Sequence, residues 1–154
     1  IKMNDCRPEL SKFFETEFKP LIKEQNRPTI SNISSTLQKL RVEIWNNYYD
    51  RLYNHQEQNG YNIPFLPNYS TNNAHMFYLK CNNVEQRSSL IKHLKENDIL
   101  AVFHYISLHD SPFYIGKHDG RILPKTDKFT DTLLRLPLFY ELDIDVVMKK
   151  VLEF

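Results

Sequence analysis

The sequence predicts an α/β domain with two layers (an α+β arrangement), in which helices cover one side of a small antiparallel or mixed sheet of about three strands. Three observations predict this class. Apolar residues recur at three- and four-residue steps between residues 37 and 52, a strand, a helix and a second strand follow one another between residues 75 and 105, and Asp143 precedes a last helix. A chain of 154 residues with 41% apolar side chains is the usual size of one compact domain.

The first part of the chain has a different pattern from the rest. Pro8–Gln25 places its apolar residues near one helical face, but Pro20 interrupts that helix. Asn26–Ser35 has the composition of a linker. We therefore divide the chain into an N-terminal helical arm and linker, residues 1–34, and a main domain, residues 35–154.

The main domain is expected to begin with an amphipathic helix. Ser34 or Ser35 is the predicted cap, and the helix should continue to about His55 and stop before Gly60. Its apolar stripe consists of Leu37, Leu40, Ile44, Trp45, Tyr48 and Leu52. Helical spacing explains this stripe as core, without any bound ligand.

The middle of the domain predicts the first two strands of the sheet. Gly60–Asn73 contains two prolines and many Asn and Ser residues, so it reads as a loop with a short extended stretch at Tyr61–Phe65. His75–Cys81 is predicted as a strand, Val84–Glu96 as a helix and Ile99–Tyr105 as a second strand.

The last third begins with a long irregular segment, Ile106–Lys125, and loops of this length in compact domains are often functional. A helix is predicted for Thr126–Leu134. Leu136–Tyr140 is predicted to be extended, with Pro137 favouring an edge or a loop-like segment. Asp143 should cap a closing helix that continues to Phe154.

Composition excludes several functions. The 20 basic and 19 acidic residues give a net charge of +1, which does not predict binding to nucleic acid or to an anionic membrane. No apolar run approaches the roughly 18–20 residues of a membrane span, and the first five residues do not resemble a signal peptide, so we expect a cytoplasmic protein. Cys6 and Cys81 are expected to be reduced structural thiols. With three glycines and no glycine-rich motif, a loop of this chain alone is not expected to bind a nucleotide phosphate.

Four segments, in order along the chain, resemble a known family. Val102–His109 (VFHYISLH) and Leu133–Leu142 (LLRLPLFYEL) are similar to the HYxPLH and LxLPxFxxL signatures of the DegT/DnrJ/EryC1/StrS sugar aminotransferases. Asn73–Tyr78 and Leu40–Tyr49 match in the same order. The resemblance covers roughly Thr36–Phe154 and does not extend over residues 1–34.

The resemblance implies the small C-terminal domain of a fold-type I enzyme dependent on pyridoxal phosphate (PLP). The intact enzyme would transfer an amino group from an amino acid, glutamate being the expected donor, to a keto-sugar nucleotide, and such enzymes are typically homodimers. In that family the lysine that binds PLP lies upstream, in a large domain that these residues do not contain. We therefore expect no cofactor on this chain alone. The alternative hypothesis is a stand-alone binding or interaction domain that kept the fold without catalysis.

The candidate site residues follow from the same resemblance. It implies that His104, Tyr105 and His109 bind the sugar-nucleotide substrate, through imidazole and phenol hydrogen bonds. In the alternative interpretation, His104 ends a strand as a satisfied polar residue and Tyr105 belongs to the core. Ser107 stands where the family usually has proline, so the backbone of this turn could differ.

Other candidates receive a structural interpretation. His104, His109 and His118 have no common zinc spacing, so no metal site is predicted, and no Ser, His and acid combination suggests catalysis. Arg135 and Lys117 are interpreted as solvated surface charges rather than phosphate ligands. His75 is interpreted as a hydrogen-bonded strand residue.

Overall fold

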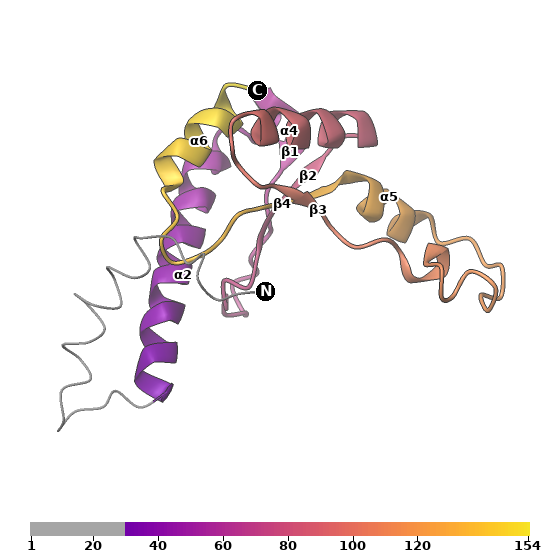
Figure 1. Cartoon of the computed structure of the whole chain (residues 1–154), viewed down its shortest axis with the longest axis horizontal. Coiled ribbons are helices and arrows are strands. Elements are labelled where there is room, and N and C mark those ends of the chain that lie inside the picture. The colour runs from indigo at the N-terminus through magenta and orange to yellow at the C-terminus, as the bar shows by residue number, and fades with distance from the viewer. Residues whose placement is uncertain (1–29) are drawn as a thin grey trace, which may run out of the picture. The chain divides into compact units, whose positions relative to one another are not determined.

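The computed structural model describes residues 30–154, with the side chains of residues 34–56 and 59–154 (Figure 1). Residues 39–154 form one compact unit, and the description below concerns that unit. The interrupted helix predicted for Pro8–Gln25 lies outside the described residues, as do residues 26–29 of the predicted linker. Residues 30–35, also predicted as linker, are helical instead and belong to the helix Ile30–Tyr53. The division at residue 34 therefore stays a prediction.

The described part of the chain contains helices and short strands, and none of these helices has the length and apolar character of a membrane span. In chain order they are α2 (Ile30–Tyr53), α3 (Gln56–Asn59), β1 (Tyr61–Asn62), β2 (Phe77–Cys81), α4 (Val84–Glu96), β3 (Val102–Phe103), the 3-10 turn η3 (Leu108–Asp110), α5 (Pro124–Thr132), β4 (Leu133–Leu136) and α6 (Ile144–Leu152).

The sheet is antiparallel and has four strands in the order β1-β2-β4-β3, which confirms the predicted α/β class. The strand prediction for His75–Cys81 is two residues too long, because β2 begins at Phe77 and His75 lies exposed in the preceding loop. Likewise, β3 occupies only two residues of the predicted strand Ile99–Tyr105.

The boundary between α5 and β4 differs from the prediction. Helix α5 ends at Thr132, and Leu133 and Leu134, expected in that helix, begin the strand. This strand is an inner one, paired with β2 on one side and β3 on the other, whereas the segment from Pro137 is loop-like, the second of the two predicted alternatives. Hydrogen bonding to two neighbours outweighs the local helical pattern here. Pro137, which has no N–H to donate, follows directly after the strand.

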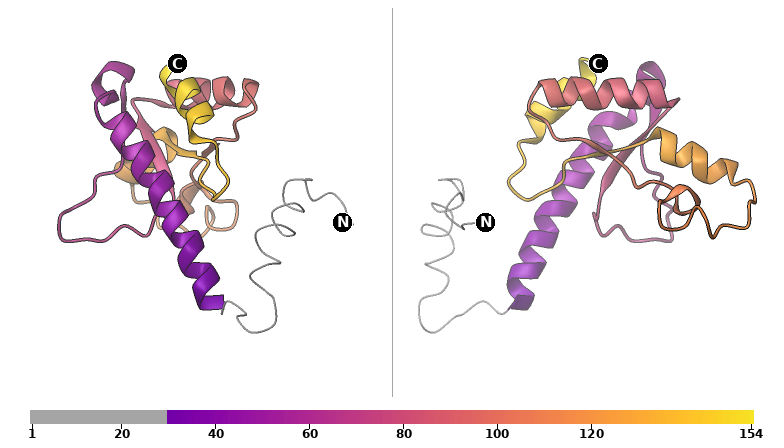
Figure 2. Two further views of the ribbon diagram at one scale, coloured as in Figure 1. Left: turned by 90° about the vertical axis from the view of Figure 1, so that its left-hand side faces the viewer. Right: turned by 45° about the vertical axis from the view of Figure 1, so that its right-hand side comes forward.

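One face of the sheet carries the core. Helices α4 and α6 pack side by side over this face (Figure 2), and the side chains that alternate toward it are buried. The core residues of the paired elements are Trp45, Tyr48 and Leu52 of α2, Phe77, Leu79 and Cys81 of β2, Leu90 and Leu94 of α4, Leu134 and Leu136 of β4, and Val147, Met148 and Val151 of α6. The second half of the predicted apolar stripe of α2, from Trp45 to Leu52, therefore lies in the core. Helix α5 contributes only Thr132 to the buried residues, so it covers the sheet less than expected.

The helix ends show which caps the sequence identifies. Asp143 accepts hydrogen bonds from the N–H groups of Asp145 and Val146, as predicted for the start of α6. Asn83 caps α4 in the same way. The predicted cap of α2 at Ser34 or Ser35 is wrong, because both serines lie inside a helix that already includes Ile30.

Candidate functional site

The segment between β3 and β4 leaves the sheet, passes through η3 and returns along α5 (Figure 1). Its chain holds all three residues that the family resemblance implies for substrate binding. Tyr105, Ile106 and Leu108 at its start are exposed, as are Phe113 and Ile115 further on. The segment is thus an extended arm with many apolar side chains in solvent.

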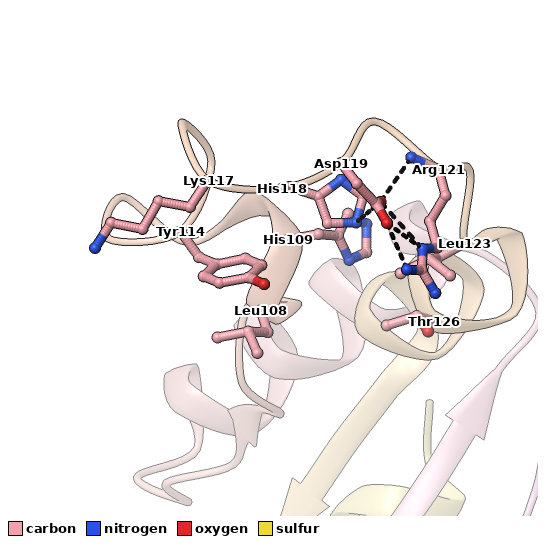
Figure 3. A pocket seen from close by; sticks show the side chains of 9 residues that line it. All are labelled: Leu108, His109, Tyr114, Lys117, His118, Asp119, Arg121, Leu123 and Thr126. Atoms are coloured by element: carbon pink, nitrogen blue, oxygen red, sulfur yellow. Dashed lines mark hydrogen bonds and ion pairs between the residues drawn. The ribbon is translucent and has the colours of Figure 1, made fainter.

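A cavity of about 430 Å³ opens between this arm and the start of α5 (Figure 3). Its lining residues are Leu108, His109, Tyr114, Lys117, His118, Asp119, Arg121, Leu123 and Thr126. Arg121 forms an ion pair with Asp119. The hydrogen bonds that its guanidinium donates to the Asp119 carboxylate hold the pKa of that carboxyl below its usual value. The Lys117 side chain points away from the cavity, and its Nζ atom lies 3.6 Å from the centre of the Phe113 ring.

His109 is fixed at one side of this cavity. Its Nε2 atom lies 2.7 Å from Oδ1 of Asp127, in the first turn of α5, and 3.5 Å from Oδ2 of Asp110. A carboxylate only accepts hydrogen bonds, so Nε2 of His109 carries a hydrogen and donates a hydrogen bond to Asp127. The side chain of His109 is 13% exposed, and its ring lies 5.3 Å from that of His118. The imidazole therefore joins the arm to α5.

His104 and Tyr105 lie in a different place, beside β4. The two rings are 4.9 Å apart, and the Arg135 guanidinium lies 5.1 Å from the centre of the Tyr105 ring. The backbone N–H of His104 still bonds to the sheet, at Leu133 O. Burial lowers the pKa of His104, and the charge of Arg135 lowers it further, so the imidazole is neutral at pH 7.

The structure thus brings His104 and Tyr105 together but does not join them to His109 by any described contact. His109 lines the cavity, whereas the other two residues do not. Tyr105 is 69% exposed and not part of the core, so the structural alternative for that residue is wrong. Sequence reasoning missed Asp127 and Arg135 as neighbours of the candidates. The sequence gives no local signal for either neighbour, because Asp127 meets His109, and Arg135 meets His104, only through the tertiary fold.

The backbone at Ser107 keeps the conformation that proline would impose. Its φ is −56°, within the range of the pyrrolidine ring, and its N–H has no partner among the described residues. The Ser107 hydroxyl instead donates to Oδ2 of Asp110 at 2.6 Å. The departure from the family's proline therefore adds a side-chain hydrogen bond without changing φ.

The described residues show one cluster with metal-ligand chemistry, formed by His109, Asp110 and Asp127, whose ligand atoms all lie within 4.8 Å of one another. Two ligands on a tetrahedral zinc ion lie about 3.3 Å apart, given bonds of about 2.0 Å. The 2.7 Å contact between His109 and Asp127 is shorter than that separation and is a hydrogen bond. The cluster is therefore arranged as a hydrogen-bonded pair with a neighbouring acid.

A cofactor such as PLP needs a lysine in a pocket, with an acidic residue facing the pyridine nitrogen. In the part of the chain that the structure describes, the only lysine that lines the cavity is Lys117, and it points outward. Lys80 lies instead over the Phe129 ring. The described residues do not fit PLP by themselves.

This fold is that of an aminotransferase domain. It matches TlmJ from Streptoalloteichus hindustanus, an aminotransferase, with a TM-score of 0.66 and 24% identity, over 76% of this chain and 31% of that one. NtdA from Bacillus subtilis, solved with bound cofactor PMP, matches with a TM-score of 0.66 and 24% identity, over 77% of this chain and 28% of that one. PseC from Helicobacter pylori, an aminotransferase involved in the biosynthesis of pseudoaminic acid, matches with a TM-score of 0.68 and 16% identity, over 80% of this chain and 34% of that one.

The chain belongs to the DegT/DnrJ/EryC1/StrS aminotransferase family, whose profile matches residues 12–153. The profile match therefore begins 24 residues before Thr36, the position at which the resemblance of the motifs begins. The chain spans about a third of the length of the solved structures described above.

Proposed function

We propose that these residues form the C-terminal domain of a PLP-dependent aminotransferase that acts on a keto-sugar nucleotide and that they are not catalytic alone. The observation that carries the proposal is family membership over residues 12–153, combined with a fold that corresponds to about a third of each aminotransferase it matches. PLP would supply the amino-group chemistry, held by residues outside those described.

The proposed substrate is a dTDP-4-keto-6-deoxyhexose, with glutamate as amino donor. This part of the proposal rests on the resemblance of the motifs at Val102–His109 and Leu133–Leu142 to those of dTDP-4-amino-4,6-dideoxygalactose transaminase. In this proposal His104, Tyr105 and His109 contact the sugar nucleotide from the arm between β3 and β4. A cytoplasmic homodimer belongs to the same proposal.

The exposed arm supports the part of the proposal in which another body completes the site. Apolar side chains such as Phe113 and Ile122, 76% and 85% exposed, are costly in water, and exposed apolar surface of this kind often marks a contact surface. The cavity beside them is open to solvent, and its lining includes His109 and His118.

The test begins with the gene in which this sequence lies. Its complete product should show the PLP absorbance band, lose it with hydroxylamine, and transfer an amino group from glutamate to the keto-sugar nucleotide. The 154-residue chain alone should be colourless in the presence of PLP. In the complete product, His104→Ala and His109→Ala should raise KM for the sugar nucleotide and leave the cofactor band unchanged.

A contrary result is equally clear. If the complete product neither takes up PLP nor transfers an amino group, the proposal is wrong. Binding of a partner or a small molecule without turnover would then support the stand-alone binding domain.

A further inference from the structure

The face of the sheet opposite the core, here called the outer face, is basic and aromatic. Its strand residues are those that alternate with the core positions, namely Asn62, Tyr78, Lys80, Val102, Leu133 and Arg135. The strand register places Tyr78, Arg135 and Val102 in one row across three strands. No acidic residue occupies these positions, so the two cations of this face have no carboxylate partner on the strands themselves.

Arg135 is distinguished from the other described arginines by its lack of an acceptor. The remaining four each donate to an oxygen: Arg41 to Ala74 O and His75 O, Arg51 to Asp145, Arg87 to Thr130 O and Arg121 to Asp119. Arg135 has no hydrogen bond or ion pair to any described residue, and its buried Nε has no partner. Its described contact is with the Tyr105 ring.

A guanidinium group has five N–H donors and prefers planar oxyanions that accept two of them at once. The Nε atom of Arg135 is buried away from water and has no acceptor among the described residues, and such an unsatisfied buried donor is uncommon in native proteins. The guanidinium carbon of Arg135 lies 5.1 Å from the centre of the Tyr105 ring, a contact with a ring face that does not use the N–H donors.

His104 repeats the pattern next to Arg135. Its Nδ1 atom is also buried without a partner, and its ring is tilted against Tyr105. The titratable groups that face it in the described structure are Arg135 and Tyr105, so no acid is available to compensate the arginine from this side. Two unsatisfied polar groups, one on β4 and one just after the neighbouring strand β3, therefore lie beside one exposed phenol.

We propose that Arg135, with His104 and Tyr105, binds an oxyanion of a ligand, a phosphate or a carboxylate, at the edge of the outer face. The oxyanion accepts hydrogen bonds from the guanidinium fork, and the phenol of Tyr105 donates a further one from the solvent side. The link to particular ligands rests on the proposed function, in which the sugar nucleotide carries a diphosphate and the amino donor carries carboxylates. Anion binding itself does not depend on turnover.

The experiment measures binding to the 154-residue chain by isothermal titration and NMR, at fixed ionic strength so that general screening is constant. Inorganic pyrophosphate and glutamate are the two probes, and they distinguish a phosphate site from a carboxylate site. We expect saturable binding of at least one probe, in roughly the millimolar range typical of a small ligand at an open site. Arg135→Gln should weaken it at least about tenfold.

Two further variants separate binding from folding. Arg135→Lys keeps the charge but not the fork, so it should retain part of the affinity and the same circular dichroism spectrum. Arg51→Gln is the matched control, since it removes an arginine that is already paired with Asp145 on another element, and it should bind like wild type.

The NMR titration of His104 adds a readout that a structural role would not change. Bound oxyanion offsets the charge of Arg135, so the pKa of His104 should rise when the probe saturates the site, and this rise should be absent in Arg135→Gln. Absence of saturable binding of both probes, or equal binding by wild type and Arg135→Gln, overturns the proposal. Neither result bears on whether the complete gene product transfers amino groups, so the two proposals fail separately.

Discussion

The hydroxyl of Tyr48 donates a hydrogen bond to the carbonyl oxygen of Pro137 at 3.0 Å, across 89 residues of sequence. It ties the buried stripe of α2 to the chain as it leaves β4. Trp45 makes a similar bond one turn earlier, from Nε1 to Met76 O at the entrance of β2. The helix therefore holds the ends of two neighbouring strands, and its polar atoms are satisfied inside the core.

We expect Tyr48→Phe to destabilise the domain by about 1–2 kcal/mol, because the carbonyl of Pro137 loses its partner in a poorly solvated position. Urea unfolding followed by circular dichroism measures this change. Tyr53→Phe, on the same helix with an exposed ring, is the control and should change stability by less than about 0.5 kcal/mol. Equal effects of the two substitutions would show that the Pro137 bond contributes nothing.

Alkaline pH should destabilise the fold through Cys81. Burial raises the pKa of this thiol to about 11, although the charge of Arg87 acts in the opposite direction. The unfolded thiol has a pKa of about 8.5, so the stabilising term is complete below that pH and is lost as the pH rises toward 11. Burial also raises the pKa values of Tyr48 and Tyr61, which adds a further loss above about pH 10.

The measurement compares urea midpoints at pH 8 and pH 10 for wild type and Cys81→Ala. The variant starts from lower stability because it leaves a small cavity, but its midpoint should fall less over this range. An identical fall in both proteins would mean that the Cys81 thiol does not control the response.

The hydrogen bond between His109 and Asp127 should govern the opening of the arm rather than the stability of the whole domain. In Asp127→Ala the amide hydrogens of residues 106–123 should exchange roughly five- to tenfold faster, corresponding to about 1 kcal/mol of local opening. The melting temperature should change little, because α5 contributes one buried residue to the core. Hydrogen exchange read by mass spectrometry separates the two regions.

Asp131→Ala is the matched control on the same helix, since this carboxylate is exposed and forms no described ion pair. Asp127→Asn should restore much of the protection, because its amide oxygen still accepts from Nε2 of His109. If the arm exchanges at the same rate in Asp127→Ala and wild type, the bond does not hold it.

Ser107→Pro should be tolerated. The φ of −56° suits proline and no N–H bond is lost, so the lower entropy of the unfolded chain, about 0.4–1 kcal/mol, offsets the loss of the bond to Asp110. Ser111→Pro is the contrasting change, because φ is −66° there but the N–H donates to Leu108 O. Thermal melts should show a clear loss only for Ser111→Pro, and a larger loss for Ser107→Pro would contradict this account.

The sequence by itself determined the elements whose signals are local. Helical spacing identified the stripe that includes Trp45 and Tyr48, and Asp143 marked the start of α6, because a cap and the backbone that it satisfies lie within three residues. The two motifs around His104 and Arg135 identified the family for the same reason, since they are contiguous.

Only the tertiary structure decided what Leu133–Leu136 becomes and what its charged residue meets. A short leucine-rich run is compatible with both helix and strand, and pairing with β2 and β3 selects the strand. That choice turns Leu134 and Leu136 into the core and Arg135 outward, beside Tyr105 and away from any acid. The partner of a side chain depends on contacts between distant segments, which no local pattern specifies.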